Sequence, residues 1–90
     1  MGEKAEELKV PLRKGLPVEV LSVENKLIFR GKVESFGKGS VTVTDARGRD
    51  LPAGVYGTLL KLRFEYSEYN VIAAGKVVRS NAEQWRLEEL

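Results

Sequence analysis

Apolar and polar positions alternate most clearly in residues 27–43. The apolar or small positions of this stretch are Leu27, Phe29, Gly31, Val33, Val41 and Val43. A period of two puts one face of a strand into a core, so the stretch predicts a β-hairpin with one buried face. Its turn lies at residues 36–39, where Gly37 and Gly39 can take the positive φ angles of a tight hairpin.

The segment before this hairpin, residues 16–23, also alternates, but its phase changes near Val20 and Leu21. Such a change predicts a first strand with a bulge, after which Leu21 and Val23 take the inward positions. Residues 24–26 are polar and predict the turn into the hairpin.

Three strand-like segments follow in the second half of the chain. Residues 60–66 alternate and predict a strand with a basic outer face. Residues 71–78 form an apolar run, which predicts a strand buried on much of both sides or lying mid-sheet. Residues 84–87 predict a last strand whose Trp85 and Leu87 face inward, with the tryptophan filling the core.

Six short strands separated by turns, with no clear helix, favour an all-β fold. An open antiparallel meander of this kind exposes its edges, whereas a closed barrel has none. Gly31 and Gly75 lie inside two of the strands, and glycine there commonly marks a bend or a close backbone crossing, which barrel closure needs. We therefore predict a small six-stranded antiparallel β-barrel over residues 16–90.

Residues 1–15 form a short N-terminal arm in this interpretation. Residues 3–8 are rich in helix formers but too few for a stable helix, which predicts a frayed arm or one helical turn. Lys9, Arg13 and Lys14 then give an extended, basic lead-in. Such an arm either folds over a ligand on the barrel or is a solvated tail.

Composition limits the class of protein. Ninety residues with 42% hydrophobic and 31% charged residues make one globular domain. No apolar run approaches the roughly 20 residues that span a bilayer, so we expect a soluble chain without membrane insertion. The absence of cysteine and of a secretion signal fits a cytoplasmic location.

The residue types argue against catalysis. Histidine and cysteine are both absent, which removes the commonest general base, the thiol nucleophile and the usual transition-metal ligands. We expect neither an enzyme nor a bound cofactor or metal. The glycine turn lies near Arg30, Lys32 and Lys38, so it is either a cradle for an anion or only a turn.

Scaffold motifs in three places resemble the PilZ family. They are Gly31-Lys32-Val33 before a glycine turn, Gly57-Thr58 before residues 59–62, and Gly75-Lys76-Val77-Val78-Arg79 ahead of Trp85. The resemblance covers roughly residues 9–87. It implies a six-stranded barrel that serves as a receptor or adaptor in bacterial cyclic di-GMP signalling.

The family binds this dinucleotide with an Arg-x-x-x-Arg arm and an Asp-x-Ser-x-x-Gly turn. Here the arm register falls on residues 9–13, where Arg13 matches one arginine and Lys9 replaces the other. The turn register falls on residues 34–39, where Glu34 replaces the aspartate, Phe36 replaces the serine and Gly39 matches. The ligand-binding candidates that this resemblance implies are Lys9, Arg13, Lys14, Glu34, Gly37, Lys38 and Gly39.

These departures favour an adaptor over a receptor. Arginine pairs bidentately with phosphate whereas lysine is a point charge, so we expect weak or absent cyclic di-GMP binding. Phe36 suits a contact with another protein or domain. A true receptor that uses Arg13 and Lys14 as its arm is the alternative. A basic barrel that binds single-stranded nucleic acid through exposed aromatics is a further one.

Overall fold

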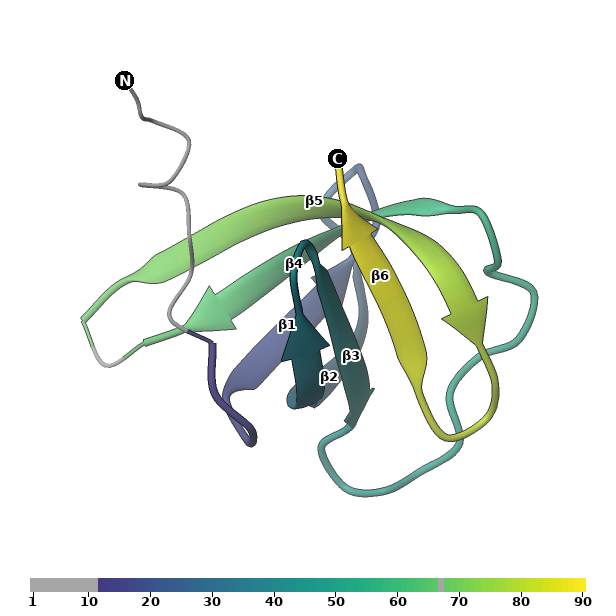
Figure 1. Cartoon of the computed structure of the whole chain (residues 1–90), viewed down its shortest axis with the longest axis horizontal. Coiled ribbons are helices and arrows are strands. Elements are labelled where there is room, and N and C mark those ends of the chain that lie inside the picture. Colours follow the sequence, from purple (N-terminus) through teal and green to yellow (C-terminus); the bar gives the residue numbers. More distant parts are fainter. Residues whose placement is uncertain (1–11, 67) are drawn as a thin grey trace.

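The computed structural model describes residues 12–66 and 68–90, and that part of the chain consists of strands and loops. The strands are β1 (Pro17–Leu21), β2 (Leu27–Gly37), β3 (Ser40–Asp45), β4 (Leu59–Glu65), β5 (Asn70–Ser80) and β6 (Trp85–Glu89). They close into an antiparallel barrel in the order β1-β2-β3-β6-β5-β4 (Figure 1). The predicted six-stranded all-β barrel is confirmed. Within the described part, no helix has the length and apolar character to cross a membrane.

The β1–β2 register shifts between Val20 and Leu21, where a bulge in the first strand is predicted, but the extra residue is Ile28 of β2. The first strand itself pairs with β4 without a shift, so the bulge lies on the partner strand. Leu21 is buried, but Val23 is exposed, so its predicted inward position is wrong. The strand ends at Leu21, and the Ser22 hydroxyl accepts backbone hydrogen bonds from residues 24 and 26 to form a turn. Leu27 lies beside this turn and is 46% exposed, so its predicted burial is also wrong.

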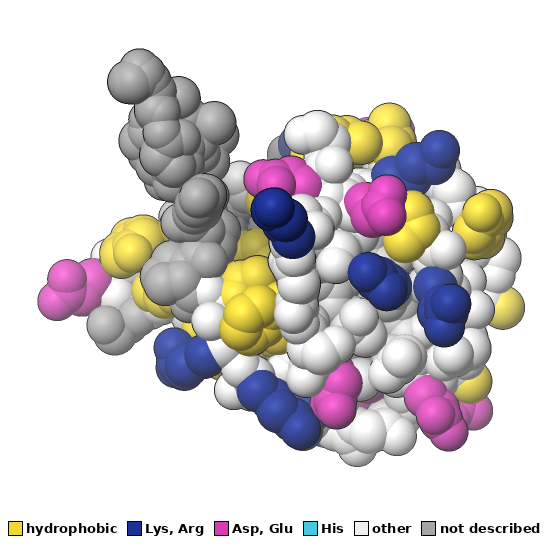
Figure 2. Space-filling model, viewed as in Figure 1, with side chains coloured by type: hydrophobic (Ala, Val, Ile, Leu, Met, Phe, Trp, Pro, Cys, Tyr) yellow, Lys and Arg dark blue, Asp and Glu magenta, His cyan; other side chains and the backbone are white. Residues whose placement is uncertain are grey.

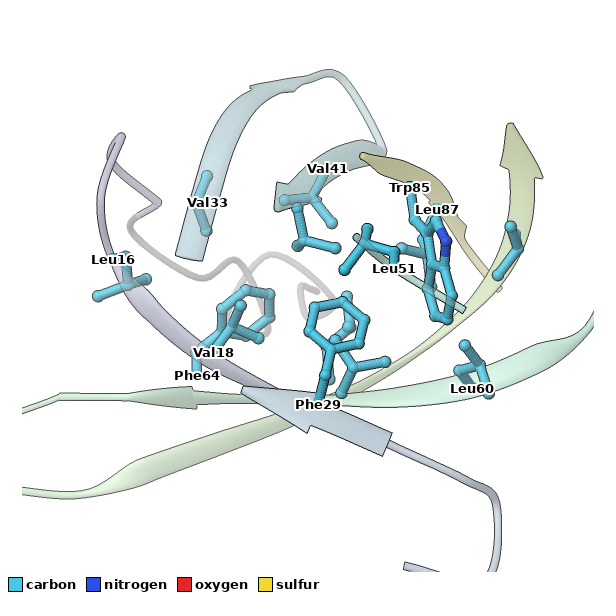
Figure 3. Packing of buried hydrophobic residues seen from close by; sticks show 14 residues of the cluster. Leu16, Val18, Phe29, Val33, Val41, Leu51, Leu60, Phe64, Trp85 and Leu87 are labelled. Atoms are coloured by element: carbon cyan, nitrogen blue, oxygen red, sulfur yellow. The ribbon is translucent and has the colours of Figure 1, made fainter. Parts of the chain in front are cut away.

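The core lies inside the barrel and is built around Trp85, which is fully buried. The Phe29 and Trp85 rings meet edge to face with centroids 5.0 Å apart and an interplanar angle of 85°. Figure 3 shows these rings packed among aliphatic side chains from the surrounding strands. The predicted inward positions of Trp85 and Leu87 are confirmed.

The glycines inside β2 and β5 mark close backbone approaches, as predicted. A Cβ atom at Gly31 would collide with the Thr44 carbonyl oxygen of β3. A Cβ at Gly75 would lie 3.2 Å from the Glu88 carbonyl oxygen and 3.3 Å from the Leu87 Cβ of β6. Neither glycine has a positive φ angle, so backbone conformation does not require glycine there. The requirement comes from the lack of space for a Cβ atom.

The apolar strand β5 differs from the prediction that it is buried on much of both sides. Gly75 and Val77 face the core, whereas Ile72 is 58% exposed and Ala74 is exposed. A closed barrel has a single interior, and no described element packs over the outer face of β5. The strand does lie mid-sheet, between β4 and β6.

The outer face of β1 carries a buried carboxylate, Glu19, between two arginines. Arg30 lies opposite it on β2 and Arg63 opposite it on β4. Arg30 Nε is 3.1 Å from Glu19 Oε2, and Arg63 donates to Oε1. The Arg63 hydrogen bond, with the charges of both arginines, outweighs burial and lowers the pKa of the Glu19 carboxyl below its usual range.

We expect Glu19→Gln to destabilise the barrel by about 1–2 kcal/mol at pH 7, because it removes a charge that two arginines share. A lowered folded-state pKa stabilises the protein above the unfolded-state pKa and ceases to do so as the pH falls through the folded value. The deficit should therefore narrow as the pH falls below about 4.3, the ordinary pKa of a glutamate in an unfolded chain. Urea unfolding from pH 7 to pH 3, with Glu24→Gln in an exposed turn as control, measures it. A deficit that does not change with pH would contradict this account.

Candidate interaction site

The tip of the β2–β3 hairpin is a two-residue loop. Gly37 pairs with Ser40, which leaves Lys38 and Gly39 between the strands. Gly39 has a φ of +71°, while Gly37 stays outside the positive region, so only one of the two glycines takes the conformation predicted for both. The Glu89 amide donates to the Gly39 carbonyl at 2.9 Å and ties the tip to β6.

A second bulge, at Glu34, decides where Phe36 points. The β2–β3 register shifts between Val33 and Ser35, so the inward phase of β2 moves from odd to even positions. Phe36 is then paired with the buried Val41 and lies on the inner side of the hairpin, beyond the closed core. Its side chain is 51% exposed.

Phe36 contributes to an open apolar cavity of about 530 Å³, which we call the barrel mouth. Its apolar lining includes Leu12, Phe36, Val41, Leu62, Phe64, Ala73 and Leu87. Lys38, Glu88 and Glu89 also line it and supply charges of both signs. Figure 2 shows hydrophobic side chains exposed beside the hairpin tip, with charged side chains around them. The barrel mouth is therefore a recess that is lined mainly by apolar side chains.

The segment that precedes β1 places two of the predicted ligand-binding residues, Lys14 and Glu34, next to each other. The Gly15 amide donates to the Val33 carbonyl at 2.8 Å, which holds this segment along β2. Lys14 Nζ lies 3.8 Å from Glu34 Oε2, so these two predicted site residues are neighbours. Both side chains are solvent-exposed, and the Glu34 charge offsets that of Lys14.

Arg13 lies near Tyr66, which forms a pair with Tyr69. Their rings stack with centroids 5.1 Å apart and an interplanar angle of 22°. Burial, then the nearby Tyr69, raises the pKa of Tyr66, and Arg13 is close enough to oppose the rise. Arg13 therefore lies near the β4–β5 connection, whereas Lys14 lies beside β2. Lys9, the other predicted arm residue, lies outside the described residues.

Sequence reasoning missed the barrel mouth as a site, although it singled out Phe36. Leu12, Leu62 and Leu87 are far apart in the chain, and only barrel closure brings them to one recess. A signal was present in Leu12, an apolar residue among the bases of the lead-in that packs against the core.

The described residues show what this recess can do chemically. Residues 12–66 and 68–90 contain no group of three or more His, Cys, Asp and Glu side chains placed to hold a metal ion. An open apolar recess with charges at its edge suits the docking of an apolar side chain from another molecule.

Comparison of the chain with family models, curated proteins and solved structures found no match in any of the three.

Proposed function

We propose that this chain is a non-enzymatic interaction module of PilZ-like type, an adaptor in bacterial cyclic di-GMP signalling that acts by protein contact. The partner inserts an apolar side chain into the barrel mouth beside Phe36. The observation that carries this proposal is the half-exposed Phe36 at the edge of an apolar recess of about 530 Å³.

The energetics favour a contact role for Phe36. A half-exposed phenyl ring contributes little to the core, while its full burial against a partner gains about 25 cal/mol for each Å² of apolar surface covered. Aromatic anchors in a recess provide much of the affinity of protein interfaces. Lys38, Glu88 and Glu89 at the edge favour a partner segment with charges of both signs next to its apolar residue.

The same geometry weakens the case for a tight dinucleotide receptor. Phe36 occupies the register of the family's serine, so a hydroxyl donor is replaced by an apolar ring. Lys14 is beside the Glu34 carboxylate, which lowers the positive charge available to a phosphate. Each lost polar contact costs about 1–3 kcal/mol, which supports weak or absent cyclic di-GMP binding.

Selection of displayed random peptides against the folded chain tests the proposal. We expect the enriched peptides to share one large apolar residue flanked by charges and to bind with micromolar affinity in solution. Backbone NMR shifts on binding should centre on Phe36, Val41 and Leu87 at the mouth. Peptides that shift other surfaces and leave these residues unmoved would contradict the proposal.

A further inference from the structure

A pair of arginines lies side by side on the outer face of the barrel, away from the core. Arg79 on β5 is directly opposite Arg86 on β6. Arg86 points outward because it is the neighbour of the buried Leu87 on β6, and the register shift between Val77 and Arg79 turns Arg79 to the same outer face, where both arginines are exposed. Side chains directly opposite on antiparallel strands lie about 5 Å apart at Cβ, so the two positive charges repel each other.

The described neighbours leave this repulsion uncompensated. Across residues 12–66 and 68–90, neither Arg79 nor Arg86 has a carboxylate oxygen within 4.0 Å. The nearest acidic residue along β6 on this face is Glu88, which lies opposite Lys76. In Figure 2, basic side chains lie side by side where Figure 1 shows β6 and the end of β5.

Hydroxyl groups continue the same row across the sheet. Arg86 is opposite Thr42 on β3, and Thr42 is opposite Ser35 on β2. Thr42 faces outward yet is buried, so neighbouring side chains cover it. Arg86 Nη2 lies 3.3 Å from Ser40 Oγ, a contact that orients its guanidinium over β3. The row thus offers two guanidinium forks next to the accessible hydroxyls of Ser35 and Ser40, whereas Thr42 is covered.

We propose that Arg79 and Arg86 form a binding site for a phosphate monoester on the outer face of β5 and β6. A monoester carries a charge of about −1.5 to −2 at pH 7, which matches two guanidinium groups. A diester carries a single charge and leaves one arginine unbalanced. Guanidinium forks pair bidentately with phosphate oxygens, and the neighbouring hydroxyls supply further donors. This site is separate from the barrel mouth, so its failure would leave the proposed function standing.

Thermal unfolding at low ionic strength and pH 7.5, with millimolar phenyl phosphate, tests the site. We expect the ligand to raise the melting temperature of the wild type and of the control Arg47→Gln, because binding to the native state stabilises it. Arg79→Gln and Arg86→Gln should bind at least about tenfold more weakly. Without ligand, Arg79→Gln should melt at or above the wild-type temperature, because the repulsion is relieved.

Two further ligands make the test specific. Dimethyl phosphate, a diester, should bind at least about tenfold more weakly than phenyl phosphate. Binding of N-acetyl-phosphoserine amide that is tighter than that of phenyl phosphate points to a phosphorylated protein as the source, and equal binding points to small molecules. No response of the wild type, equal binding of the diester, or an equal loss in Arg47→Gln would overturn the proposal.

Discussion

Replacing Gly31 by alanine should destabilise the barrel by about 3 kcal/mol or more and lower its melting temperature by at least about 12 °C. The added Cβ would collide with the Thr44 carbonyl oxygen across the β2–β3 ladder and with the Phe29 ring on the same strand. A backbone oxygen cannot turn away as a flexible side chain can. The β2–β3 pair must therefore separate, which weakens barrel closure at one of its six interfaces. Thermal and urea unfolding measure the effect.

The matched control lies on the same strand. A Cβ at Gly37 would meet only the Ser40 hydroxyl at 3.6 Å, an ordinary contact, and the φ angle of Gly37 is not positive. Gly37→Ala should therefore change stability by no more than about 1 kcal/mol. Gly75→Ala, with contacts at 3.2 and 3.3 Å, should fall between the two. Equal losses at Gly31 and Gly37 would show that steric closure is not the reason for the glycine in β2.

Replacing Phe36 by serine should weaken the binding of the selected peptides by about tenfold to a hundredfold. The ring lies at the edge of the mouth and is half-exposed, so the change removes a contact surface without opening a cavity in the core. Stability should consequently change by less than about 1 kcal/mol. Titration of a fluorescent peptide, with thermal unfolding of the same samples, separates a loss of binding from a loss of fold.

Tyr56→Ser provides the control for this change. Tyr56 is another exposed aromatic residue and does not line the mouth. Its replacement should leave peptide affinity within about twofold of the wild type, because hot-spot residues are few and local. An equal loss of affinity in both variants would mean that the peptides bind exposed aromatic residues without regard to the mouth.

Much of the fold could be predicted from local pattern. Alternation identifies the buried face of β4 through Leu60, Leu62 and Phe64, all of which are buried. The change of phase at Val20 marks the place of a real register shift, although the extra residue, Ile28, lies on β2 and not on β1. Local pattern fails where barrel closure determines which face is buried. The apolar run of β5 predicts burial on much of both sides, but a closed barrel has a single interior, so Ile72 is exposed to solvent.

The candidate site was less predictable for a physical reason. The direction of Phe36 depends on the bulge at Glu34, and a one-residue shift in a strand moves every later side chain to the other face. The regular alternation of apolar and polar residues in the first part of β2 gives no indication of this shift. The mouth itself joins Leu12 to residues of β4, β5 and β6, so it exists only after closure. The contact of Lys14 with Glu34 depends in turn on the backbone hydrogen bonds of Gly15 and Leu16 with Val33.

We propose that this barrel acts by protein contact and is not a dinucleotide receptor. Calorimetric titration of cyclic di-GMP into the folded chain tests it most directly. Phe36 and Lys9 stand where the PilZ-like resemblance implies a serine and an arginine, so we expect no saturable heat below about 100 µM ligand. Micromolar or tighter binding that disappears in Arg13→Ala would contradict the claim.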